Sequence, residues 1–117
     1  GHPQHVVDCY RMGYPMFDSS MPTRDARHGR LLVMREPRGS LDGDWFSYLY
    51  VRDEHLVKDG RPISEACDCL VCRRYSRAYL RHLYSIKDGL YNRLATIHNL
   101  RFVAQLMERL REGDGER

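Results

Sequence analysis

Three of the chain's four cysteines lie within one short stretch, CDCLVC, which runs from Cys67 to Cys72. The spacing Cys-x-Cys-x-x-Cys can place three sulfurs around one ion on a tight turn, and a tetrahedral Zn²⁺ needs one further ligand. A disulfide between Cys67 and Cys69 would close a very small, strained ring. Three free thiols would leave the spacing unexplained. We therefore predict a zinc site, which constrains how residues 67–117 fold.

Cys9 and six histidines could supply the fourth zinc ligand. His98 fits best, because it lies near the start of a predicted helix, on the side shared with Leu94 and Ile97, and so should face inward. His82 is the alternative, whereas Cys9 fits a small buried apolar residue. Four protein ligands leave no open position on the metal, so the zinc should be structural rather than catalytic.

Two helices are predicted after the cysteines and should pack antiparallel. The first begins at Cys72 and ends where Gly89 interrupts the pattern; the second runs from Leu90 or Tyr91 to about Arg111, followed by a frayed tail. Apolar spacing of three and four predicts one buried face on each helix. These faces consist of Tyr75, Tyr79, His82, Leu83 and Ile86 on the first helix, and of Ile97, Leu100, Val103, Met107 and Leu110 on the second.

The N-terminal half alternates short apolar runs with polar turns. Residues 14–20 read as a buried strand, and Asp18 lies at its carboxyl end, where α/β folds place functional residues. The other predicted elements are a helix over 3–12, a loop over 21–30, strands over 31–34 and 45–51 paired as a hairpin across a turn-rich connection, and an irregular polar segment over 52–66.

Composition is that of an ordinary soluble domain, with 42% apolar and 30% charged residues among 117. No run of about 18 apolar residues predicts a membrane span, and the first ten residues do not resemble a secretory signal. We therefore expect a cytoplasmic, reducing environment, in which clustered cysteines bind metal more readily than they form disulfides.

The net charge of +3 is unevenly distributed along the chain. Residues 73–111 hold nine Arg or Lys and two acids, a balance of +7, so the remaining residues sum to −4. An Arg-rich segment suits a phosphate-rich partner, but it can equally be the solvated face of a helix. Charge alone leaves both interpretations open.

Two groups of motifs resemble one known family. The cysteine stretch, SRAYL at 76–80 and His98-Asn99 are similar to the C-terminal zinc-binding segment of tRNA-guanine transglycosylases, the queuine tRNA-ribosyltransferases. GYPMFDSSMPTRDARHGRL at 13–31 resembles the Met-Phe-Asp, Pro-Thr-Arg and Ala-Arg-x-Gly segment of that family. Both groups occur in the family's order and together span nearly the whole chain, although residues 35–60 depart from the pattern.

The resemblance implies a reaction and a set of site residues. Family members exchange the wobble guanine of certain tRNAs for a 7-deazaguanine base, and the Asp of Met-Phe-Asp, here Asp18, is their nucleophile. Thr23, Arg24 and Arg27 match the segment that holds the anticodon loop; the alternative role for the arginines is solvated loop charge or a pair with Asp25. The zinc ligands implied are Cys67, Cys69, Cys72 and His98.

The resemblance also implies a fold. The family enzyme is a TIM barrel, which needs about 200–250 residues, so this chain would supply its C-terminal portion with a zinc-binding helical subdomain. The class is α/β, or α+β for the isolated segment. We expect three regions: 1–34 with the last barrel elements and the nucleophile loop, 35–66 with the hairpin and an irregular connection, and 67–117 with the zinc subdomain.

Several expectations concern partners and activity. The partners would be the tRNA anticodon loop and a 7-deazaguanine base, with no membrane, and the chain would form a homodimer or join an N-terminal half. It should be inactive alone, because the residues that bind the base lie elsewhere. The alternative is a non-catalytic, zinc-stabilised module for tRNA binding or dimerisation.

Overall fold

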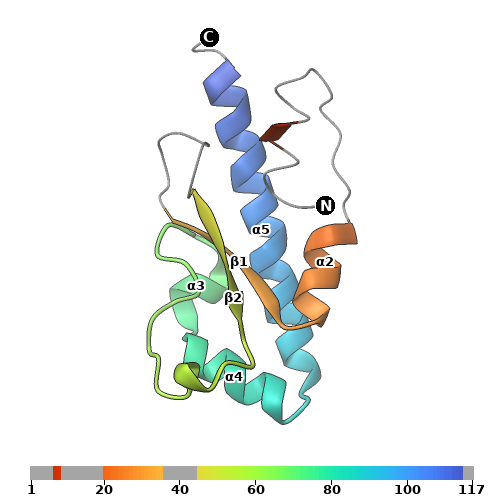
Figure 1. The fold of residues 1–117 in the computed structure, drawn as a ribbon, viewed down its shortest axis with the longest axis vertical. Helices are drawn as coiled ribbons and strands as arrows, with labels where there is room; N and C mark the ends of the chain where they lie inside the picture. The colour runs from red at the N-terminus through yellow and green to blue at the C-terminus, as the bar shows by residue number, and fades with distance from the viewer. Residues whose placement is uncertain (1–6, 9–19, 36–44, 115–117) are drawn as a thin grey trace.

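The computed structural model describes residues 7–8, 20–35 and 45–114 of the chain (Figure 1). Helices and a two-stranded sheet combine in it, in agreement with the α+β class expected for the isolated segment. The elements are α2 (Ser20–Arg27), β1 (Arg30–Met34), β2 (Phe46–Tyr50), the 3-10 turn η1 (Glu54–Leu56), α3 (Leu70–Arg74), α4 (Arg77–Ser85) and α5 (Gly89–Asp114).

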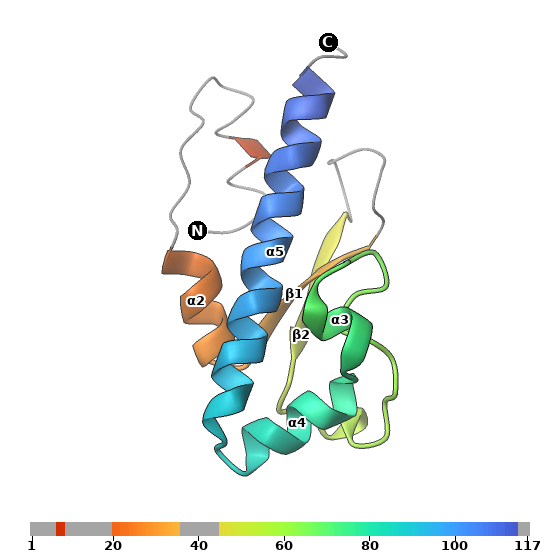
Figure 2. The same ribbon diagram turned by 180° about the vertical axis from the view of Figure 1, so that it is seen from behind.

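Helix α5 forms the axis on which the other elements pack. α2 lies along one side of it, and the hairpin and α3 lie on the other (Figures 1 and 2). α4 runs crosswise at the start of α5, not antiparallel beside it as predicted. α3 is therefore the helix that carries the cysteine turn against α5. No helix in the described ranges combines the length and apolar character that crossing a membrane requires.

Strands β1 and β2 pair antiparallel, which confirms the predicted hairpin. Arg30 lies opposite Tyr50, and Met34 lies opposite Phe46. The Arg30 guanidinium also lies 4.6 Å from the centre of the Tyr48 ring, a cation–π contact that links neighbouring strands. The segment that follows is irregular, as predicted, apart from η1.

The predicted loop over 21–30 is wrong, because Ser20–Arg27 form helix α2. Proline is compatible with the first turn of a helix, and Pro22 is buried there. Ala26 is fully buried, so the helix packs on the core along one side. The polar composition of this segment obscured that contact.

Of the predicted helix over 3–12, the structure describes Val7 and Asp8, both helical. The predicted strand over 14–20 lies outside the described residues except for Ser20, which begins α2.

Gly29 follows the end of α2, and its conformation requires a glycine there. Its φ of +80° lies in the left-handed region, and an added Cβ would lie 3.2 Å from the Tyr84 ring. The residue occupies the C′ position typical of glycine after a helix. The Ala-Arg-x-Gly motif thus has a structural reason for its last member.

The single helix predicted from Cys72 is instead two. α3 ends at Arg74, and the Ser76 hydroxyl accepts a hydrogen bond from the Tyr79 amide at 3.1 Å, which begins α4. The predicted stripe is also partly wrong. Leu83 is buried as expected, but Leu80 is its buried companion, while Tyr79 and Ile86 are exposed.

The buried face of α5 is rotated from the predicted one. Val103 and Leu110 are buried as predicted, but Ile97 and Leu100 are 41% and 46% exposed. The face toward the core instead includes His98, a neighbouring asparagine and Phe102. His98 therefore faces inward with Leu94, but not with Ile97. The helix also continues through Asp114, beyond the predicted end.

Candidate metal centre

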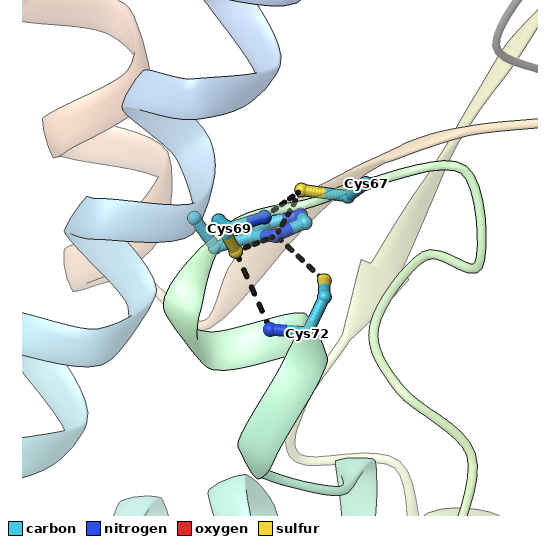
Figure 3. Close-up of side chains that lie close together, drawn as sticks. Cys67, Cys69 and Cys72 are labelled. Atoms are coloured by element: carbon cyan, nitrogen blue, oxygen red, sulfur yellow. Dashed lines mark hydrogen bonds between the residues drawn. The ribbon is translucent and has the colours of Figure 1, made fainter.

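The three cysteines lie on a turn that leads into α3. The Cys67 amide donates to the Ser64 carbonyl at 3.2 Å, closing the turn. Cys69 is the N-cap of α3, and its sulfur accepts from the Cys72 amide at 3.4 Å. The Cys67 sulfur likewise accepts from the Cys69 amide. Backbone N–H groups thus orient the sulfurs, which converge on one point (Figure 3).

His98 completes the group from α5, as predicted. Its Nδ1 lies 3.7, 3.6 and 3.3 Å from the sulfurs of Cys67, Cys69 and Cys72. A tetrahedral Zn²⁺ with ordinary bond lengths separates a sulfur and a nitrogen ligand by about 3.6 Å, so the side chains fit the ion. The alternative ligand His82 is exposed and outside the group, and Cys9 lies outside the described residues.

A backbone carbonyl orients the histidine. The other ring nitrogen, Nε2, lies 2.6 Å from the Leu32 carbonyl oxygen and donates to it. In the neutral ring that metal binding requires, this bond places the proton on Nε2 and leaves the Nδ1 lone pair toward the sulfurs. His98 is 1% exposed, so its ring has little freedom to turn.

The pKa values of the four side chains indicate that a bound cation would stabilise the group. Hydrogen bonds with Cys67 and Cys72 lower the pKa of Cys69, and hydrogen bonds with Cys67 and Cys69 raise the pKa of Cys72. Burial lowers the pKa of His98, but hydrogen bonds with Cys67 and Cys69 outweigh it and raise the pKa to about 9. The thiols therefore do not all ionise side by side unless positive charge is added, and a bound Zn²⁺ would add it and release protons.

The arrangement is chemically that of a closed structural site. Four protein atoms lie within 4.8 Å of one another, and Cys69 and His98 are buried. No coordination position remains for a substrate or water. The three thiols are free rather than paired in disulfides. This Cys₃His group has the composition expected for the zinc of the family that the motifs resemble.

Comparison with known proteins decides the family. The family model described as "Queuine tRNA-ribosyltransferase" matches residues 1–113. The chain belongs to the queuine tRNA-ribosyltransferase family. The predicted resemblance is thus confirmed, and the Cys₃His group fits zinc binding in such a protein.

Curated relatives show how much of such a protein the chain represents. The queuine tRNA-ribosyltransferases of Thermoanaerobacter pseudethanolicus and Caldanaerobacter subterraneus subsp. tengcongensis are each 43% identical over 112 residues, covering 96% of this chain and 27% of the relative. That of Symbiobacterium thermophilum is 43% identical over 111 residues, covering 95% and 25%. The chain therefore spans about a quarter of the length of these relatives.

The other predicted site residues lie on or before α2. Thr23 is half-buried, while Arg24 and Arg27 are exposed on the helix. Neither arginine forms an ion pair with Asp25, because that buried carboxylate pairs with Arg30 at 2.6 Å. The pair with Asp25 is therefore wrong as their alternative role, whereas solvated charge fits their exposure. Asp18 lies outside the described residues.

Several basic residues of the C-terminal segment have structural partners. Arg77 donates to the carbonyls of Pro62 and Ile63. Arg101 pairs with Asp68 at 2.7 Å, and a neighbouring amine of the same guanidinium reaches Glu108. Part of the positive charge of 73–111 therefore secures the fold, and the segment is not a uniform phosphate-binding surface.

Sequence reasoning missed the polar residues that bind the second edge of β1. Ser64 and Asn99 are buried, and both bond to backbone atoms of this strand. Neither residue belongs to a metal-ligand pattern. The only sign of such a role in the sequence was that Asn99 is a polar residue among the apolar residues of a helix. Asn99 was visible in the family motif, but the motif assigned it no role.

Proposed function

We propose that this chain is the C-terminal portion of a tRNA-guanine transglycosylase. The complete enzyme would exchange the wobble guanine of tRNA for a 7-deazaguanine base in the cytoplasm. The observation that carries the proposal is the match of residues 1–113 to the family, with the Cys₃His group assembled at 3.3–3.7 Å from His98 Nδ1. The remaining three quarters would supply the rest of a TIM barrel and the base pocket.

Asp18 is the proposed nucleophile. A carboxylate oxygen of Asp18 attacks C1′ of the ribose, the C1′–N9 bond breaks, and guanine departs with the electron pair. The ribose is left as an ester of Asp18, and the departing guanine takes a proton from an acid/base group that the rest of the enzyme would supply. The ring N–H nitrogen of the incoming base then attacks C1′, returns its proton to that group and releases the carboxylate. An aspartate suits this chemistry because it can both stabilise positive character on the ribose and bond to it, as in retaining glycosidases.

Helix α2 is the proposed RNA-contacting element. It begins at Ser20, close after Asp18 in sequence, and it exposes Arg24 and Arg27. Arginine can stack on unpaired bases and bind phosphate with two hydrogen bonds, which suits an anticodon loop with its target base turned outward. Thr23, in the same helix, would add a hydroxyl contact.

Zinc would serve this function indirectly. When bound, it would cross-link the cysteine turn to α5 and supply folding free energy. His98 then holds Leu32 in β1, the strand that follows α2. The metal would keep the RNA-contacting helix in place without taking part in the reaction.

We also propose that this chain binds other protein surfaces. Large apolar side chains are exposed directly after α4 and on α5, among them Ile86, Ile97 and Leu100. Tyr75 and Tyr79 also stack at a centroid distance of 5.3 Å near the start of α4. A homodimer partner and the N-terminal part of the enzyme are the proposed contacts of these surfaces.

The test replaces Asp18 by Asn in the full-length enzyme that contains this chain. The Asp18→Asn change keeps the shape of the side chain but removes its charge, so guanine exchange should stop while tRNA binding persists. A covalent tRNA adduct should be trapped with native enzyme and not with D18N, and the control E54Q, which changes an exposed carboxylate of η1, should behave as native. If D18N still exchanges guanine near the native rate, Asp18 is not the nucleophile. If the native enzyme binds tRNA but never exchanges guanine, the non-catalytic module is correct.

A further inference from the structure

Side chains occupy the edge of β1 that does not face β2. The Arg30 carbonyl accepts from Asn99, the Leu32 carbonyl from His98, and the Met34 carbonyl from the Ser64 hydroxyl at 2.8 Å. The Leu32 amide donates to Asn99 at 3.0 Å. Because an unpaired buried backbone group is costly, these side chains replace a neighbouring strand.

Asn99 bonds to three backbone groups at once, two in β1 and one in α2. It is 0% exposed. Its Oδ1 accepts from the Leu32 amide, while Nδ2 donates to the carbonyls of Pro22 and Arg30 at 3.0 and 3.1 Å. Among side chains of this length, a carboxamide alone can accept one bond and donate two in this way. The Pro22 carbonyl belongs to the first turn of α2.

A second α5 side chain holds the other end of α2. The buried Tyr91 hydroxyl donates to the Ala26 carbonyl at 2.7 Å. Residues eight apart lie on one face of a helix, so Tyr91 and Asn99 approach α2 from the same side. This leaves the opposite side of α2, with Arg24 and Arg27, exposed. The next residue before Asn99 is the metal ligand His98.

We propose that Asn99 is a positioning residue for RNA binding, with Tyr91 as its counterpart. Together they fix α2 on α5, and Asn99 does so from the position adjacent to a zinc ligand, so that the metal centre and the arginines of α2 form one rigid unit. This inference rests on the proposed function of α2. Neither residue contacts RNA in this account; each acts through the placement of Arg24 and Arg27.

The test compares three variants of the full-length, zinc-loaded enzyme. Y91F and S64A each delete one buried hydroxyl that donates to a backbone carbonyl, but Y91F frees α2 and S64A frees the far end of β1. N99D keeps the acceptor for Leu32 and loses both donors. The readouts are zinc content, hydrogen exchange of α2 peptides, and KM for tRNA against kcat.

We expect Y91F to speed α2 exchange and raise KM for tRNA about fivefold, the scale of one lost hydrogen bond, with zinc content unchanged. N99D should show about a tenfold rise in KM, or more. S64A should leave the hydrogen exchange of α2 and the KM for tRNA at native values. Equal α2 exchange in Y91F and S64A would overturn the inference, as would faster exchange without any rise in KM in an active enzyme. A native enzyme that neither binds tRNA nor exchanges guanine would instead overturn the proposed function, and α2 exchange would still decide whether Tyr91 and Asn99 hold the helix.

Discussion

The metal centre and helix α2 are built in opposite ways. Three of the four zinc ligands lie within six residues, so the ligands are set by local spacing and only His98 comes from afar. Helix α2 is held by Asn99 and Tyr91, which are 77 and 65 residues distant from their partners. A chemical site made of neighbours is visible in sequence, whereas a surface element held by remote side chains is not.

Loss of a zinc ligand should have the largest effect and tests the first half of this contrast. C69A removes the α3 N-cap and one metal ligand, so we expect zinc content to fall and α3 and α4 to unfold, because structural zinc contributes several kcal/mol or more to folding. Circular dichroism and metal analysis measure the two effects. E65Q, exposed in the same turn and outside the ligand set, should keep zinc and fold; helical content retained in zinc-free C69A would contradict the account.

A smaller effect is expected where α2 ends. G29A should cost about 1–3 kcal/mol of unfolding free energy, because alanine resists positive φ and its Cβ meets Tyr84. Denaturant unfolding measures the cost. G60A is the matched control, since an added Cβ there meets nothing within 4 Å and no positive φ is involved. Equal stabilities of the two variants would show that the end of α2 is not constrained as described.

Removal of an α2 arginine should weaken RNA binding without changing the fold. R27A should raise the Kd for a tRNA anticodon stem-loop about tenfold, the scale of one charged contact to phosphate. R109A, in the C-terminal part of α5, should have a smaller effect, and binding by native protein should weaken steeply as salt rises. Fluorescence anisotropy across a salt series gives both results. Equal losses in R27A and R109A would place RNA binding on general positive charge rather than on α2.

The smallest expected effect concerns the connection before the cysteines. A hydrogen bond from Arg61 lowers the pKa of Asp59 below its ordinary value of 3.8, with further help from the Arg77 charge. A lowered pKa stabilises the fold above pH 3.8, and this contribution is lost as pH falls below that value. D59N should therefore lower Tm by no more than about 4 °C at neutral pH. Thermal melts at pH 7 and 3 test this. The Tm difference between the native protein and D59N should shrink at pH 3. An unchanged difference would show that the ion pair does not stabilise the fold.

Sequence identified the three cysteine ligands and the hairpin because each depends on local chemistry. Cysteine spacing determines these three ligands, and apolar runs on both sides of a turn determine the strands. It failed on the buried face of α5, because the helix directs the polar Asn99 inward to satisfy β1 while Ile97 remains exposed. Hydrophobic periodicity cannot detect that a polar residue is buried while an apolar neighbour is exposed. The break between α3 and α4 depends on a single cap, Ser76, within an otherwise helical pattern.

Hydrogen exchange with and without zinc tests most directly whether the metal centre and α2 form one unit. His98 bonds to the Leu32 carbonyl, and Asn99 beside it bonds to the Leu32 amide and to α2. Metal removal should therefore increase exchange in α3, at Leu32 and across α2 together, and restored zinc should return protection to all three. If zinc removal exposes α3 while Leu32 and α2 keep their native protection, the two regions are independent and the account is wrong.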